Sequence, residues 1–152
     1  MQALVAAEWR KLGFMEVGAV PREWRQRRTA VQVVLEDEWN FLDVEARTTH
    51  QFLRGELALG LSALGYQDLD VSTVRGPDRR VTRLISDWAY NAHDDVGNAL
   101  FGGIRYRSRL DTEWELWAAF GDVQLQPVDS KPILLESPEL QDVAAEFGLT
   151  IH

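Results

Sequence analysis

Residues 102–110, GGIRYRSRL, decide the fold that we expect for this chain, because apolar and basic side chains alternate along them. Alternation with a period of two is typical of a half-buried β-strand, whose successive side chains point to opposite faces. We therefore expect a strand over residues 103–109, with Ile104, Tyr106 and Ser108 on one face and Arg105, Arg107 and Arg109 on the other. The arginine face suits an anion, a carboxylate-rich partner or water.

The composition predicts one globular domain over residues 1–152. The chain has 152 residues, a net charge of −8 and 45% hydrophobic residues, which is typical of a single folded domain. The absence of cysteine excludes disulfides, thiolate metal sites and cysteine nucleophiles. The negative charge argues against direct binding of nucleic acid. The sequence has no apolar run long enough to span a membrane and no signal-peptide pattern, so we expect a cytoplasmic protein.

Hydrophobic periodicity predicts an α+β fold in which helices flank a mixed or antiparallel sheet. Helices are expected at residues 2–12, 47–64, 77–91 and 137–147, the last of them the C-terminal helix that begins at Ser137-Pro138. Strands are expected at residues 29–36, 41–44, 103–109, 114–120 and 123–128, with Gly121-Asp122 as a hairpin turn between the last two. PREWRQRR (21–28) is interpreted as a basic connector, and Pro127 and Pro132 as the ends of a loop.

Few residues stand out as candidates for catalysis. The three histidines have no paired spacing, and the sequence contains no phosphate-binding GxxxxGK[ST], no GxGxxG and no GxSxG, so we expect no metal site. Glu8 lies in ALVAAEW (3–9), on an otherwise apolar helix, and Ser108 lies on the Ile/Tyr face of the arginine strand. A single Glu or Ser in such a position is more often structural than catalytic. Taken alone, the residues indicate only an acidic α+β domain.

Several segments together resemble the RES domain family, which is named for an Arg, a Glu and a Ser. GGIRYRSRLDTEWELWAAFGD (102–122) is similar to the C-terminal signature of the family, with a Gly-Ile, a Tyr two residues before a Ser and an aromatic-ended strand. ALVAAEWRKL (3–12) resembles the helix with the family glutamate, and VPREWR (20–25) followed by a strand and FLDV (41–44) fits the usual order. GPDRRVTRLISDWAY (76–90) resembles the helix before the final strands.

This resemblance implies an ADP-ribosyltransferase-like fold and an enzyme that takes NAD as its substrate. Such proteins cleave the nicotinamide–ribose bond by hydrolysis or phosphorolysis, and many are toxins of bacterial toxin–antitoxin pairs, held inactive by a helical antitoxin. Ser108 matches the family serine and Glu8 the family glutamate, so these two are the expected catalytic residues. Tyr106 and Arg105 belong to the same motif and are expected to bind NAD.

The sequence departs from the family pattern in one respect. The family places its Arg, and a Tyr after it, ahead of the glutamate helix, but this sequence contains no GGRW-like stretch. Arg105, Arg107 and Arg109 are the expected substitutes as ligands of the NAD phosphates, because guanidinium groups bind phosphate in a bidentate manner. If the chain is a toxin, its expected partner is a helix-turn-helix antitoxin. The alternative is a non-catalytic RES-like remnant that acts as a binding or regulatory protein, whose exposed surface a partner or a second copy of the chain covers. A chance similarity in an unrelated acidic α+β domain is the third hypothesis.

Overall fold

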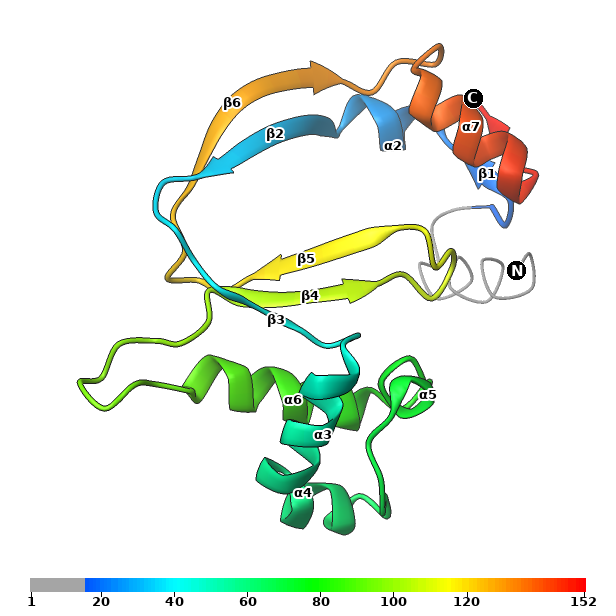
Figure 1. Ribbon diagram of the computed structural model, residues 1–152. Helices are drawn as coiled ribbons and strands as arrows, with labels where there is room; N and C mark the ends of the chain where they lie inside the picture. The colour runs from blue at the N-terminus through cyan, green and yellow to red at the C-terminus, as the bar shows by residue number, and fades with distance from the viewer. Residues whose placement is uncertain (1–15) are drawn as a thin grey trace. The chain divides into compact units, whose positions relative to one another are not determined.

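A computed structural model describes residues 16–152 and confirms the α+β class (Figure 1). The described chain forms two compact units, one of residues 16–34 with 125–152 and the other of residues 35–124. The helix expected at 2–12, and Glu8 with it, lies outside the described residues. Within them, no helix has the length and the apolar character that crossing a membrane requires.

The unit of residues 35–124 contains a mixed sheet of three strands. Strand β4 (Gly103–Arg107) lies in the centre, parallel to β3 (Phe41–Asp43) and antiparallel to β5 (Glu115–Ala119). In this register Asp43 of β3 and Trp117 of β5 both lie beside Arg105. The expected alternating strand is therefore present, and it ends at Arg107, two residues earlier than expected.

Four helices of the same unit surround the core that this sheet covers. They are α3 (Arg47–Glu56), α4 (Ala58–Ala63), α5 (Val71–Val74) and α6 (Arg79–Asn91). Burial is nearly complete for the apolar residues of α3, α4 and α6 that face inward, as expected for amphipathic helices. The buried core consists of Leu42, Val44, Leu53, Leu57, Leu61, Leu69, Val74, Val81, Ile85 and Ala89, and Ile104 and Tyr106 of β4 pack against it.

The helix expected over residues 47–64 is interrupted, which corrects the sequence prediction. Leu57, with φ −102° and ψ 13°, separates α3 from α4. Leu53, Leu57 and Leu61 are all buried, so the interrupted helix still keeps its apolar stripe on the core. Helix α6 agrees with the prediction, and the Asp78 side chain caps it by accepting a hydrogen bond from the backbone N–H of Arg80.

In the described residues of the other unit, 16–34 and 125–152, there are two pairs of strands and two helices. Strands β1 (Ala19–Val20) and β7 (Thr150–Ile151) are parallel, and β2 (Thr29–Leu35) is hydrogen-bonded to β6 (Leu125–Pro132). Helix α7 (Pro138–Phe147) confirms the expected C-terminal helix, with Pro138 in its first turn and Gly148 in the left-handed conformation after it (φ 64°).

The segment PREWRQRR is not a plain connector, because residues Arg22–Gln26 form helix α2. Arg25 on this helix is buried, with 9% of its surface exposed, and its Nε donates a hydrogen bond to the backbone oxygen of His152 at 3.0 Å. The basic stretch therefore contributes one buried arginine to the packing of its unit. The sequence did not predict this role, because most residues around Arg25 are charged.

The expected hairpin at Gly121-Asp122 is wrong, since β5 pairs with β4 and β6 pairs with β2. The chain turns after Phe120, whose backbone oxygen accepts the N–H of Val123, and Val123 is buried. Pro127 and Pro132 lie within β6 rather than at the ends of a loop. A two-stranded ribbon has two outer edges, and a strand edge tolerates proline because no neighbour needs its missing N–H.

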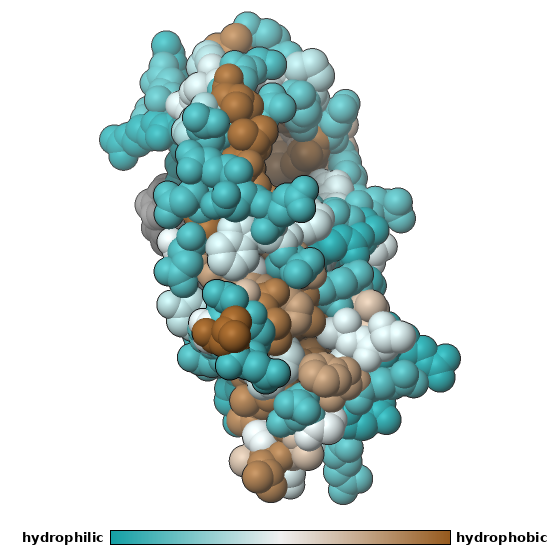
Figure 2. Space-filling model, turned by 60° about the vertical axis from the view of Figure 1, so that its left-hand side comes forward, coloured by the Kyte–Doolittle hydropathy of each residue, from teal (hydrophilic) through white to brown (hydrophobic). Residues whose placement is uncertain are grey.

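All residues of β2 and β6 are exposed, the valines and leucines among them included. In Figure 2 hydrophobic residues likewise reach the surface between hydrophilic ones. This ribbon contributes nothing to the core of the 35–124 unit, where the candidate site lies.

Candidate functional site

Ser108 lies directly after β4, on the strand face that packs against the helices. Ile104 and Tyr106 contact the core, and Ser108 is 6% exposed. The backbone N–H of Ser108 donates to the oxygen of Trp114 at 2.9 Å, and its hydroxyl oxygen accepts the N–H of Leu110 at 3.1 Å. The alternation expected from the sequence is therefore confirmed on this face. Within the described part of the chain, the structure records no acceptor for the Ser108 hydroxyl proton.

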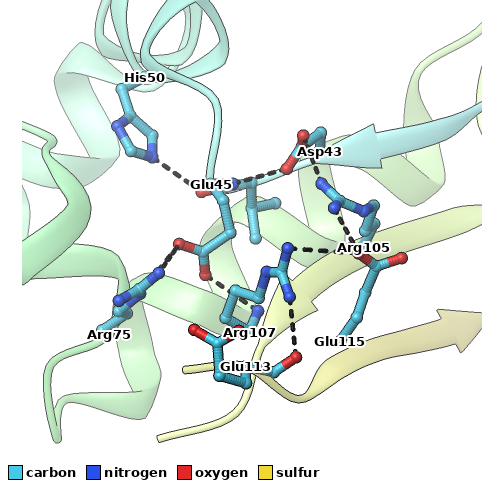
Figure 3. Close-up of polar contacts among 9 residues, drawn as sticks. Asp43, Glu45, His50, Arg75, Arg105, Arg107, Glu113 and Glu115 are labelled. Carbon is cyan, nitrogen blue, oxygen red and sulfur yellow. Dashed lines mark hydrogen bonds and ion pairs between the residues drawn. The ribbon is translucent and has the colours of Figure 1, made fainter. Parts of the chain in front are cut away.

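The opposite face of β4 carries the arginines, and carboxylates surround them (Figure 3). Arg105 forms an ion pair with Asp43 at 2.7 Å and a second one with Glu115. Arg107 lies 3.6 Å from the same Glu115 carboxylate and donates to the backbone oxygen of Glu113 at 3.0 Å. The sequence suggested an anion, a carboxylate-rich partner or water as neighbours of the arginine face. In the structure Arg105 and Arg107 lie beside carboxylates of their own unit.

These contacts change the ionisation of the groups involved. The hydrogen bond from Arg105 holds the pKa of Glu115 below its ordinary value, and the same bond raises the pKa of Arg105. Partial desolvation acts in the opposite direction on both groups and is the smaller effect. The pair therefore stays ionised at neutral pH. A phosphate group that approaches Arg105 therefore competes with Asp43 and Glu115 for its guanidinium.

Arg109 lies beyond the strand and is exposed. It also has an interaction partner of its own. Of the four residues expected to bind NAD, Arg105, Tyr106 and Arg107 thus lie on β4 itself, and Arg109 follows in the turn after it.

Where the pairing of β3 with β4 ends, two side chains form hydrogen bonds to backbone groups that would otherwise bond to each other. In a parallel ladder that continued past the Val44 N–H to Arg105 O bond, the N–H of Arg107 would reach the oxygen of Val44. Instead, Nε2 of His50 bonds the Val44 oxygen at 2.7 Å, and the Glu45 carboxylate accepts the Arg107 N–H at 3.0 Å (Figure 3). This arrangement fixes the backbone immediately before Ser108.

Glu45 is held in place from a second direction. Its carboxylate accepts a hydrogen bond from Nε of Arg75 at 2.9 Å and forms an ion pair with Nη2 of the same residue at 2.7 Å, and its side chain is 12% exposed. Arg75 follows helix α5, so one carboxylate connects that helix to the end of β4. Glu45 is therefore a positioning residue for the segment that contains Ser108.

Sequence reasoning missed these carboxylates, although the pattern that reveals them is present. Asp43 and Glu115 lie in the two strand-like segments that pair with the arginine strand. Acidic side chains on neighbouring strands predict cross-strand ion pairs with its arginines. Glu45 follows β3 and pairs with Arg75, so this pattern does not predict its role. His50 gave no such signal, because its role depends on where helix α3 begins.

The described residues contain no group of three or more His, Cys, Asp or Glu side chains that could hold a metal ion. Glu8, the other expected catalytic residue, lies outside the described residues.

Comparison with protein-family models, with curated proteins and with solved structures finds no match to this chain. The resemblance to the RES family therefore stays a prediction that rests on the motifs quoted above.

Proposed function

We propose that this chain is a RES-type protein that takes NAD as its substrate and cleaves the nicotinamide–ribose bond. The observation that carries the proposal is the state of Ser108. Its hydroxyl is nearly buried at the end of the central strand and accepts one backbone hydrogen bond, and the described residues include no recorded acceptor for its proton. A buried donor without an acceptor costs free energy, and in this proposal a group of NAD accepts that proton.

The chemistry needs two kinds of help. When the bond from ribose C1 to the nicotinamide nitrogen breaks, the electron pair leaves with nicotinamide and positive charge develops on the ribose. An oxygen of water or phosphate then bonds to C1, and water gives up a proton in doing so. In this proposal the carboxylate of Glu8 stabilises the developing charge, while the hydroxyl of Ser108 orients the nicotinamide or the ribose.

The NAD phosphates need an anchor, because the positioning of a substrate contributes several kcal/mol to catalysis. Arg105 and Arg107 are the proposed ligands on the strand, and Arg109 is the proposed ligand in the turn. Since Asp43 and Glu115 occupy Arg105, NAD binding involves an exchange of carboxylate for phosphate on that guanidinium. Replacing each arginine with Ala and measuring NAD affinity tests this: unchanged affinity in all three variants removes the arginines from the site.

A second candidate function is favoured by the same ion pairs. If Arg105 and Arg107 keep their carboxylate partners, the strand has no phosphate grip and the chain is a non-catalytic binding or regulatory protein. Its partner in that case is another protein or a second copy of the chain. A cytoplasmic location, a role as the toxin of a toxin–antitoxin pair and a helix-turn-helix antitoxin as partner belong to the first proposal, that of an NAD-cleaving protein.

Nicotinamide release separates the two candidates. The purified chain is incubated with NAD, with and without phosphate, alongside the variants Ser108→Ala and Glu8→Ala. Ser130→Ala is the matched control, because Ser130 is an exposed serine on β6 in the other unit. The proposal predicts release by wild type and Ser130→Ala and loss of release in the other two variants. Absence of release from wild type at high enzyme concentration favours the binding protein.

A further inference from the structure

A pocket of about 140 Å³ lies in the 35–124 unit, at the end of β4 away from Ser108. Four aromatic side chains contribute to its lining, together with an exposed carboxylate and an imidazole. The residues that matter here are Trp39, Tyr90, Phe101, Phe120, His93 and Asp122. A cavity of about 150 Å³ is large enough for a benzene molecule, so this pocket suits a ligand of about six to eight heavy atoms.

The aromatic walls are held in place by contacts among the lining residues themselves. The rings of Tyr90 and Phe120 meet edge to face, with centroids 5.3 Å apart and planes at 86°. Gly102 lies so close to Trp39 that a Cβ there would come within 2.8 Å of the indole. The backbone N–H of Phe120 donates to the oxygen of Gly102 at 2.8 Å. The pocket is therefore formed before any ligand arrives.

The polar groups of the pocket attract positive charge. Nδ1 of His93 lies 2.8 Å from the backbone oxygen of Asn91, which places the proton on Nδ1 and leaves Nε2 as an acceptor in the neutral ring. Asp122 is exposed, and the structure records no partner for its carboxylate among the described residues. None of the described residues that line the pocket is a Lys or an Arg.

The loop that carries His93 is ordered by its own hydrogen bonds. The carboxylate of Asp94 accepts the backbone N–H groups of Val96 and Asn98 at 3.0 and 2.8 Å. A hydrogen bond from the side chain of Asn98 at 3.0 Å, followed by the backbone N–H of the same residue, holds the pKa of Asp94 below its ordinary value. Across the loop, the N–H of Leu100 donates to the oxygen of Ala92 at 2.9 Å. The imidazole is thus presented by a closed loop at the edge of the pocket.

We infer that this pocket binds a small organic cation of the methylated or quaternary ammonium class. Aromatic ring faces attract such cations, because their π electrons make the face negative, and a carboxylate beside the rings adds charge attraction. An anion would meet Asp122 without any basic group to offset it. A neutral apolar molecule would pack against the aromatic rings but would have no charge attraction to the carboxylate of Asp122. The inference concerns a different part of β4 from the proposed NAD site and does not depend on it.

Titration of the full-length chain with choline, followed by amide shifts in nuclear magnetic resonance spectra, tests the inference. The neutral isostere 3,3-dimethylbutan-1-ol is the matched ligand, since it has the same shape and lacks the charge. We expect choline to bind and to shift the amides of Gly102 and Asp122, and we expect the isostere to bind far more weakly. Equal affinity for the two ligands, or no shift with choline at millimolar concentration, overturns the inference.

Two variants test the two parts of the recognition. Tyr90→Leu removes a ring that is 48% exposed, so the fold survives, and it should weaken choline binding by roughly five- to thirtyfold. Asp122→Asn should weaken it by about two- to fivefold, and added salt should weaken binding to wild type more than to this variant. Asp142→Asn is the control, because Asp142 is an exposed residue of helix α7 in the other unit, and this variant should bind choline as wild type does. Unchanged affinity for choline in both pocket variants refutes the inference.

Discussion

Replacement of Gly103 by alanine tests how closely the three strands of the site are packed. A Cβ at this position would overlap the backbone oxygen of Ala118 on β5 and would lie 2.6 Å from Cε1 of Phe41 on β3. A side-chain atom can often rotate away from a new methyl group, but a backbone oxygen within a ladder cannot. The glycine is therefore required by its neighbours on both sides of the strand.

The expected cost follows from that geometry. Overpacking in a core costs about 1–3 kcal/mol and occasionally more, and a clash with backbone belongs at the upper end, so we expect about 3 kcal/mol for Gly103→Ala. With a urea m value of about 1.5 kcal/mol per M, the unfolding midpoint should fall by about 2 M.

Urea denaturation followed by tryptophan fluorescence measures this shift. Gly55→Ala is the matched control, because nothing lies within 4 Å of a Cβ there and the residue is inside helix α3. That variant should be as stable as wild type or more stable by about 0.5–1 kcal/mol. If Gly103→Ala unfolds at the same urea concentration as wild type, the close approach of β3, β4 and β5 described above is incorrect.

Three further predictions concern the same unit. Leu53→Ala, at a side chain with 0% exposure, should lower the free energy of unfolding by about 2–5 kcal/mol in the same urea assay, and a loss below about 1 kcal/mol would contradict its place in the core. Glu45→Ala leaves the N–H of Arg107 without its acceptor and should cost about 2 kcal/mol, whereas Glu45→Gln keeps an accepting oxygen and should cost less; equal losses would exclude the hydrogen bond. Because Arg105 lowers the pKa of Glu115 in the folded state, the stability from this pair is complete above the ordinary pKa of 4.5 and is lost as the pH falls below it. Glu115→Gln should therefore reduce the slope of unfolding free energy against pH in the acid range. An unchanged slope would count against the ion pair.

The local features of the site could be predicted from the sequence because they depend on neighbouring residues. The period of two in GGIRYRSRL placed Ile104, Tyr106 and Ser108 on one face of β4, and in the structure Ile104 and Tyr106 pack against the core and Ser108 is buried. The helical stripe at Val81 and Ile85 likewise predicted α6, and both residues are fully or nearly fully buried. A periodic pattern carries this information because side-chain direction follows directly from backbone geometry.

The features that the sequence did not reveal depend on residues far apart in the chain. Strand β6 pairs with β2, about ninety residues earlier, although Gly121-Asp122 is a strong local signal for a hairpin with β5. A short stretch of sequence does not indicate which distant strand has an edge free for pairing. The replacement of a ladder bond by Glu45 and His50 has the same origin, because it arises only where β3 stops and α3 starts.

The arginines illustrate the limit on predicting function. Their spacing correctly predicted one shared face, but the occupants of that face come from β3 and β5. Pairing with Asp43 and Glu115 means that a count of positive charges on β4 overstates its capacity to bind phosphate. The NAD affinities of the arginine variants are therefore more informative than the local charge.

The measurement that tests the central claim most directly is a single turnover of NAD with the chain in excess over its substrate. Under this condition slow product release does not limit the signal, and the nicotinamide formed reports bond cleavage itself. The account predicts that wild type converts NAD to nicotinamide and that Ser108→Ala does so about a hundredfold more slowly. Equal rates for the two proteins, or no nicotinamide from wild type, would contradict the assignment of Ser108 to an NAD-cleaving site.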